Sequence, residues 1–283
     1  MLNKTGNIHN FIGCDAAYAE ADIVIFGAPF DSTTSNRPGA RFGPSAMRGD
    51  SYGIETYSPY QNLDLENISI YDAGDLELPF GRPQPMLAAI EDAVAQIIAD
   101  GKIPLMLGGE HLVALGAIRA AAAKHPNLHI IHLDAHTDLR DDYLGESLSH
   151  ATVIRRCHDI LGDGRIFQYG IRSGLKEEFE WAKAHTKLEK FTLSGLADVR
   201  YAIGDNPVYF TLDLDVLDPA AFPGTGTPEA GGVSFSQLLD AILHLKQLNV
   251  VGCDMVELAP NLDTSGISTA VACKILRELL LTL

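Results

Sequence analysis

The stretch LHIIHLDAHTDLR at residues 128–140 decides the fold and locates the candidate site. Its first six residues are mostly apolar, which is typical of a strand buried on both faces. Asp134, His136 and Asp138 follow directly. Carboxylates that are crowded together repel one another, and each resists losing its water. The segment is therefore either a solvated loop or a site that binds positive charge.

Seven further apolar runs predict strands. They lie near residues 23–26, 68–71, 103–107, 166–170, 189–192, 207–214 and 250–256, and the run at 189–192 is the weakest. Between them, apolar residues at helical spacing predict helices over 85–100, 238–245 and 267–283, the second preceded by a capping box of Ser234 and Gln237. Alternating strands and helices predict an α/β fold, with a parallel sheet covered on both faces. Because no repeat or linker interrupts the pattern, we expect a single domain over residues 1–283.

Composition narrows the function. The chain has 283 residues, 46% of them hydrophobic, and a net charge of −16 without basic clusters, which argues against nucleic acid and suits a small cationic substrate. No run approaches the ~18 apolar residues of a membrane span. The first residues, MLNKTGNIHN, lack the apolar core of a signal peptide, and the four cysteines form no C-x-x-C pair. We therefore expect a cytoplasmic protein with reduced thiols.

Acids and histidines also follow two other predicted strands. Asp213 and Asp215 end the run FTLDLD, and Glu110 and His111 stand at a helix start in LGGEHL. Because side chains alternate along an extended chain, Asp213 and Asp215 share a face. The carboxyl ends of parallel strands meet at one edge of a sheet, so we expect these side chains to lie close to those of the stretch 134–138.

Four aspartates and two histidines at these strand ends suit two divalent ions, whose four positive charges cancel the four carboxylates. Oxygen-rich ligation with imidazole and no thiolate favours Mn²⁺, and leaves zinc, cobalt and iron open. Calcium sites are rich in carbonyl groups and seldom contain histidine. Two close ions can turn a bridging water into hydroxide near neutral pH. The proposed ligands are His111, Asp134, His136, Asp138, Asp213 and Asp215.

The chain resembles the ureohydrolases, the arginase and agmatinase family, and is most like the bacterial agmatinases among them. The matching segments are GAPFD at 27–31, RPGARFGP at 37–44, GGEHL at 108–112, DAHTD at 134–138, SHATVIRR at 149–156, DLDVLDP at 213–219, PGTGTPEAGG at 223–232 and VEL at 256–258. The resemblance implies a three-layer α/β/α fold with an eight-stranded, mostly parallel sheet. It also implies two Mn²⁺ ions per subunit and assembly as trimers or hexamers.

The resemblance assigns roles to residues of this chain. One manganese would be held by His111, Asp134, Asp138 and Asp213, and the other by Asp134, His136, Asp213 and Asp215. His150 matches the proton-transfer histidine, Glu257 matches the carboxylate that orients the guanidinium, and Asp138 would accept a hydrogen bond from the amino group of the substrate. Asp218 and Thr227 match positions that support the ligands from outside. The implied reaction releases urea and an amine.

The predicted substrate is agmatine, which would give putrescine and urea in polyamine biosynthesis. Arginine would bring a carboxylate that Asp141, Asp142 and Glu146 repel, whereas a terminal ammonium would be attracted; these acids could also belong to a solvated loop. The positive charge of Arg140 would have the opposite effect, since it would attract a carboxylate. The alternatives are hydrolysis of guanidinobutyrate, arginine or formiminoglutamate on the same fold, a deacetylase-like enzyme with a single zinc, and a non-catalytic regulator.

The remaining histidines are interpreted as structural. His129 and His132 lie inside a predicted strand, where a core or ligand-supporting role is expected. His158 and His185 lie on helical patterns and are predicted to face solvent, and Trp181 is predicted to pack. Arg172, after the strand at 166–170, is predicted to be structural or to contact another subunit.

Overall fold

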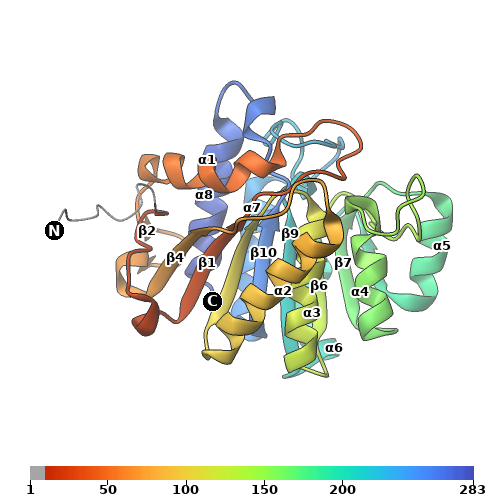
Figure 1. Ribbon diagram of the computed structural model, residues 1–283, viewed down its shortest axis with the longest axis horizontal. Helices are drawn as coiled ribbons and strands as arrows, with labels where there is room; N and C mark the ends of the chain where they lie inside the picture. Colours follow the sequence, from red (N-terminus) through yellow and green to blue (C-terminus); the bar gives the residue numbers. More distant parts are fainter. Residues whose placement is uncertain (1–9) are drawn as a thin grey trace.

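An eight-stranded sheet crosses the part of the chain that this computed structural model describes, residues 10–283 (Figure 1). Its strand order is β4-β1-β5-β10-β9-β6-β7-β8, and all neighbouring strands are parallel. The strands are β1 (Ile23–Ala28), β4 (Ile70–Asp75), β5 (Ile103–Gly108), β6 (His129–Leu133), β7 (Ile166–Ile171), β8 (Lys187–Lys190), β9 (Pro207–Asp213) and β10 (Asn249–Val256). The predicted sheet is confirmed, with each strand at or within a few residues of its predicted place. An antiparallel pair, β2 (Tyr57–Ser58) and β3 (Leu63–Asp64), was not predicted.

Helices cover both faces of the sheet, which completes three layers. One face carries α2 (Pro83–Ala99), α3 (Ala114–Lys124), α4 (Val153–Leu161) and α5 (Lys176–His185). The other carries α1 (Gly43–Asp50), α6 (Val199–Ile203), α7 (Phe235–His244) and α8 (Ile267–Leu280). The capping box predicted for Ser234 and Gln237 is present at the start of α7. Within residues 10–283, every helix is too short or too polar to cross a bilayer.

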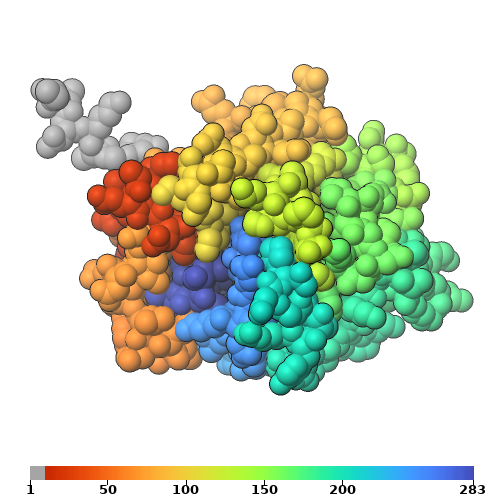
Figure 2. Space-filling view, turned by 90° about the horizontal axis from the view of Figure 1, so that it is seen from below, coloured from red at the N-terminus to blue at the C-terminus, as the bar shows by residue number. Residues whose placement is uncertain are grey.

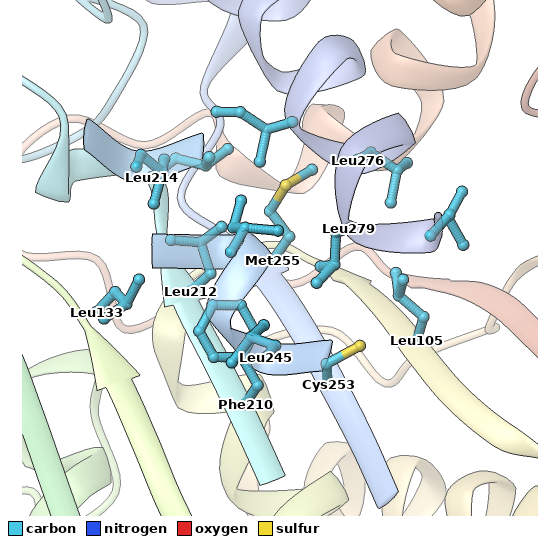
Figure 3. Close-up of a cluster of buried hydrophobic side chains, with 14 of the residues drawn as sticks. Leu105, Leu133, Phe210, Leu212, Leu214, Leu245, Cys253, Met255, Leu276 and Leu279 are labelled. Atoms are coloured by element: carbon cyan, nitrogen blue, oxygen red, sulfur yellow. The ribbon is translucent and has the colours of Figure 1, made fainter. Parts of the chain in front are cut away.

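The core lies in two layers because strand side chains alternate between the two faces. In β1, Ile23 and Ile25 join the cluster under α7 and α8, whereas Val24 and Phe26 join the cluster under α2 and α3. Figure 3 shows the first cluster, in which side chains of β9, β10 and α8 meet. In the view from below, residues near 90–100 (yellow) lie toward the top of the molecule and residues near 200 (teal) toward the bottom (Figure 2). The central strands are thus buried on both faces, as their apolar sequences predict.

The strand order brings the candidate site together. The four central strands are β5, β10, β9 and β6, although they are far apart in the sequence. His111 follows β5, Asp134 follows β6, Asp213 ends β9 and Glu257 follows β10. Because these strands are parallel and adjacent, all four residues lie at one edge of the sheet.

Asp263 fastens the first turn of α8. Its Oδ2 accepts hydrogen bonds from the backbone nitrogen and the hydroxyl of Ser268, at 2.8 and 2.7 Å, and its Oδ1 accepts from Ser265. Replacing a side chain that accepts from a first-turn backbone nitrogen, as a helix cap does, by alanine costs about 0.5–2 kcal/mol. We expect Asp263→Ala to lower the free energy of unfolding by that amount in urea denaturation at pH 7.

The pH dependence of this loss follows from the same contacts. Hydrogen bonds from Ser265 and then Ser268 lower the pKa of Asp263 to about 2. A carboxylate with a lowered pKa stabilises the fold above its unfolded pKa of about 3.9, and this contribution is lost as the pH falls toward its folded pKa. The difference between wild type and Asp263→Ala should therefore stay constant from pH 7 to about pH 4 and narrow below it. If the stability difference already began to narrow near neutral pH, the lowered pKa of Asp263 would not be its cause.

Candidate metal centre

One ring nitrogen of His111 faces three carboxylates. Nδ1 lies 3.0 Å from Asp134 Oδ2, 3.1 Å from Asp138 Oδ2 and 3.4 Å from Asp213 Oδ2. All four side chains are buried. The sequence placed these residues after three different strands, and the structure brings them into contact.

A second group of possible ligands shares one of these carboxylates. His136 Nδ1 lies 2.9 Å from Asp215 Oδ2 and 3.4 Å from Asp134 Oδ1. Asp213 is connected to this group through its Oδ1, which accepts a hydrogen bond from the backbone nitrogen of Asp215 at 2.8 Å. All six predicted ligands therefore form one continuous cluster, in which Asp134 touches both histidines.

The surroundings of His111 test whether this cluster suits a metal ion. Its Nε2 lies 3.0 Å from the hydroxyl of Thr211, and that hydroxyl donates to Asp254 Oδ1 at 2.7 Å. Because Thr211 donates its only proton to Asp254, it must accept from Nε2–H of His111. In the neutral ring, Nδ1 then presents a lone pair, and it makes no hydrogen bond within residues 10–283. A cation between Nδ1 and the carboxylates satisfies all of them, so the residues fit a metal ion.

The electrostatics agree with this fit. Burial, then the charge of Asp134, raises the pKa of Asp138 to about 7, and burial raises the pKa of Asp213 well above its usual value. Burial opposes a charged His111, but contacts with Asp134, Asp138 and Asp213 raise its pKa well above 6.5. The cluster thus holds excess negative charge that only bound protons or bound cations neutralise.

His132 supports the cluster from outside. The amide of Gln168 donates to His132 Nδ1 at 3.1 Å and to the carbonyl of Thr137 at 2.8 Å. The proton of neutral His132 must therefore be on Nε2, which lies 2.8 Å from Asp134 Oδ2. His132 donates to a carboxylate and has no lone pair left for an ion on that side. The predicted supporting role is the one its hydrogen bonds favour.

Glu257 and Asp138 have strained backbones. Both have positive φ values, 67° and 52°, a region that residues with side chains seldom adopt. Glu257 is held by a bond from its backbone nitrogen to the carbonyl of Gly109 at 2.9 Å, and its Oε1 accepts from the backbone nitrogen of His111 at 2.8 Å. Such strain is commonly found where a side chain must point into a functional site.

His150 lies at the mouth of the centre. Its backbone nitrogen donates to the hydroxyl of Thr33 at 3.1 Å, and its Nε2 lies 3.1 Å from the hydroxyl of Ser35. Thr33 in turn donates to the buried carboxylate of Glu110, whose pKa burial raises to about 7. Burial lowers the pKa of His150 to about 4, so the ring is neutral at pH 7.

A cavity of about 260 Å³ opens onto these residues. Its walls include the candidate ligands His111, His136, Asp138 and Asp213 together with Ser35, Arg140, Tyr143, His150, Glu178, Thr227 and Glu257. The guanidinium of Arg140 lies 4.5 Å above the ring of Tyr143, and the ring of His150 meets Tyr143 edge-on. The cavity is large enough for a small linear molecule and is closed at its base by acids.

The predicted acidic loop does not line this cavity. Asp141 is exposed and lies 2.5 Å from Arg156, while Asp142 accepts from the backbone nitrogen of Gly145 within the turn. Glu146 is also exposed. The solvated-loop interpretation is therefore correct for all three: α4 and the turn hold Asp141 and Asp142 outward, and Glu146 is exposed. The residues of this loop that do reach the cavity are Arg140 and Tyr143.

Other predicted residues have identifiable roles. The Thr227 hydroxyl donates to Asp215 Oδ2 at 3.4 Å, as expected of a supporting residue. Asp218 instead accepts from the backbone nitrogens of Ala220, Gly231 and Gly232, away from the ligands, so it shapes the loop. The guanidinium of Arg172 donates to backbone carbonyls, including that of Asp215 at 2.7 Å, which is the predicted structural role. His158 and His185 are partly buried and do not simply face solvent, contrary to the prediction.

Several residues of the site were not predicted. Ser35, Thr33, Gln168, Thr211 and Asp254 act through contacts between distant segments, which the sequence does not show. A signal existed for two of them. Asp254 and Thr211 are polar residues inside otherwise apolar strands, and a buried carboxylate in a strand requires a partner.

The chain matches known proteins over nearly its whole length. Residues 21–282 match the model of the family described as Arginase family. The chain is 50% identical to the agmatinase of Bacillus anthracis over 275 residues, which cover 96% of this chain and 95% of that protein. It is 38% identical to the mitochondrial guanidino acid hydrolase of Homo sapiens, over 93% of this chain and 78% of that protein.

The similarity to known proteins also extends to the fold. The crystal structure of a proposed agmatinase from Clostridium difficile superposes with a TM-score of 0.92 at 50% identity, covering 94% of this chain and 98% of that one. Because the family match spans nearly the whole sequence and similarity in sequence and fold extends over the same length, this chain is a member of the arginase family.

Proposed function

We propose that this protein hydrolyses the guanidino group of agmatine to putrescine and urea, with two Mn²⁺ ions as cofactors. The observation that carries the proposal is the cluster of buried carboxylates and histidines at the base of a cavity, in a chain half identical to an agmatinase. His111, Asp134, Asp138 and Asp213 would hold one ion, and Asp134, His136, Asp213 and Asp215 the other. When bound, the ions supply charge neutralisation and activation of a water near neutral pH.

Glu257 is the proposed anchor of the guanidinium. A guanidinium is a planar cation that pairs best with a carboxylate. Glu257 uses Oε1 to accept from His111 and lines the cavity, so Oε2 remains for a ligand. Asp138, on the same cavity, would accept from the substrate's amino group as its central carbon becomes tetrahedral. Since the guanidinium carbon is a poor electrophile, holding it in one orientation lowers the barrier to attack.

His150 is proposed to move the proton that the leaving amine needs. Its lowered pKa keeps the ring neutral before reaction, so it can take up a proton and then pass it on. We expect His150→Ala to keep both metal ions and to lower kcat by about 10²–10⁴-fold, the usual contribution of general acid–base catalysis. Metal analysis and urea release from the same preparation check this. Loss of metal in His150→Ala would instead make His150 part of the metal site.

The far end of the substrate would meet Arg140, Tyr143 and Glu178. The Glu178 carboxylate already accepts from the Thr137 hydroxyl at 2.7 Å and from the backbone nitrogen of Leu139 at 3.0 Å. Arg140 lies 3.9 Å from Glu178, so the two charges partly compensate each other. The remaining positive charge of Arg140 supports the second candidate function, hydrolysis of a guanidino acid such as guanidinobutyrate.

Arg140→Gln separates these two functions. If agmatine is the substrate, the change removes a cation near its ammonium, and kcat/KM for agmatine should stay equal or rise a few-fold. If a guanidino acid is the substrate, kcat/KM for guanidinobutyrate should fall by roughly tenfold or more, since a hydrogen bond to a charged group is worth about 1.5–3 kcal/mol. The measurement is urea release from both compounds by wild type and variant.

A panel of substrates tests the proposal as a whole. Manganese-loaded protein should release urea faster from agmatine than from arginine or guanidinobutyrate, and no formamide from formiminoglutamate. If one of the other three compounds were hydrolysed faster than agmatine, that compound would be the substrate. A single-zinc enzyme would bind one ion per chain, where we expect two. The predicted trimer or hexamer can be tested separately by light scattering of the purified protein.

A further inference from the structure

Two histidines and one aspartate meet at the C-terminal ends of α4 and α5, outside the candidate metal centre. His158 Nε2 lies 2.7 Å from Asp163 Oδ1, and His185 Nδ1 lies 2.6 Å from the same oxygen. His158 lies near the end of α4, His185 ends α5, and Asp163 lies in the turn after α4. We propose that this His158–Asp163–His185 cluster is a surface binding site for a transition-metal dication of the zinc class.

The backbone holds the three side chains in place. Asp163 lies between Gly162 and Gly164, whose positive φ values of 79° and 73° allow a tight turn. The backbone nitrogen of Gly162 donates to the carbonyl of His158 at 2.8 Å, and that of Gly164 donates to the carbonyl of His185 at 3.0 Å. The turn that carries the aspartate is thus attached to both histidines.

An aromatic side chain fixes the orientation of both rings. Trp181 stacks on His185 with ring centres 4.1 Å apart, and meets His158 edge-on at 4.7 Å. The guanidinium of Arg155 covers Trp181 at 4.2 Å. The two imidazoles are therefore oriented before any ion arrives, which lowers the entropic cost of binding.

The donor set suits zinc better than manganese or calcium. Two imidazoles and one carboxylate are typical ligands of Zn²⁺, Co²⁺ and Ni²⁺, and the ligand atoms lie within 4.8 Å of one another. Bonds of about 2.0–2.1 Å at tetrahedral angles place ligand atoms roughly 3.3 Å apart, so the carboxylate must withdraw by roughly 0.6 Å. Asp163 can do so, because its side chain is 66% exposed. Water would complete the coordination.

Binding at this cluster would connect α4 and α5, which both contact the loop at residues 139–149: Arg156 of α4 pairs with Asp141, and Glu178 of α5 accepts from Leu139. α4 starts at Val153, close after His150. An ion shared by the ends of α4 and α5 would stabilise the folded protein in proportion to its binding free energy. The site does not depend on the proposed function, since it shares no residue with the candidate metal centre.

Counting bound zinc tests the proposal. Metal-free full-length protein is dialysed against micromolar Zn²⁺ and analysed by plasma mass spectrometry, alongside Asp163→Asn and the double variant His158→Gln/His185→Gln. We expect the wild type to bind one more Zn²⁺ per chain than either variant. Zinc should also raise its melting temperature more than it raises theirs. Asp163→Asn keeps an oxygen acceptor in an exposed turn, so its melting temperature without zinc should match the wild type.

Asp159→Asn is the matched control. Asp159 is an exposed aspartate in α4, and its carboxylate pairs with Arg156 at 3.2 Å and with neither histidine side chain. The Asp159→Asn substitution removes the same charge as Asp163→Asn but leaves the three proposed ligands in place. The Asp159→Asn protein should therefore bind as much zinc as the wild type. Equal zinc content and equal melting shifts in the wild type, Asp163→Asn and the double variant would overturn the proposal. If Asp159→Asn also lost the additional ion, general surface charge would be responsible and the proposed site would be rejected.

Discussion

Asp213→Asn is expected to lose metal and hydrolytic activity together. Asp213 lies 3.4 Å from His111 Nδ1 and hydrogen bonds to the backbone nitrogen of Asp215, so it touches both halves of the cluster. An amide is a neutral and weaker ligand for a hard dication than a carboxylate. The loss of activity should exceed the 10–100-fold that removal of an outer hydrogen-bond partner of a metal ligand costs. Metal analysis and urea release from one preparation measure both effects.

The fold should survive this change. Four carboxylates packed together repel one another, and replacing one of them by an amide of the same shape relieves that repulsion in the metal-free protein. Metal-free Asp213→Asn should therefore melt at the same temperature as the metal-free wild type, or higher. Asp218→Asn is the control, because Asp218 bonds to backbone nitrogens only and should keep both ions. Full activity of Asp213→Asn with its metal content lost would refute the metal-dependent account.

Glu257→Gln should reduce substrate use while leaving the metal in place. The amide oxygen can still accept from the backbone nitrogen of His111, which keeps the side chain in position. Its NH₂ group would then replace a carboxylate oxygen on the cavity and repel the N–H groups of a guanidinium. Breaking one side of a buried charged pair costs about 2–5 kcal/mol, so kcat/KM for agmatine should fall by roughly 30-fold to several thousand-fold.

Asp142→Asn serves as the control for Glu257→Gln. Asp142 is an exposed carboxylate that caps Gly145 outside the cavity, and asparagine can replace it there. If long-range attraction by the acidic surface governed substrate use, both variants would lose activity to a similar degree. We expect only Glu257→Gln to do so, at unchanged metal content. Unchanged kinetics in Glu257→Gln would exclude its proposed contact with the guanidinium.

The sheet was predictable because its strands are buried on both faces. Such strands carry nearly continuous apolar runs, as in β6 and β9, and these runs identify themselves without any tertiary information. The weak edge strand β8 was displaced by two residues because it is more exposed and more polar. The β2–β3 pair has two residues in each strand, which is too short for a period to be recognised.

The clustering of the candidate ligands was predictable at the strand ends, whereas the arrangement of the loops around them was not. Its six proposed ligands follow strands, and the order of strands in a parallel sheet brings such residues to one edge. The direction of loop side chains has no such rule, so Asp141 could not be assigned to solvent until Arg156 of α4 was located beside it. The partners that orient the ligands, Thr211 and Gln168, act across strands and required the three-dimensional structure.

Manganese titration is the most direct test of the central idea that bound dications neutralise the acids at the sheet edge and make hydrolysis possible. Protein freed of metal by a chelator is titrated with Mn²⁺ while urea release from agmatine is followed. We predict no activity without metal and a rise that saturates at two Mn²⁺ per chain. Urea released at the full rate by metal-free protein would contradict the account.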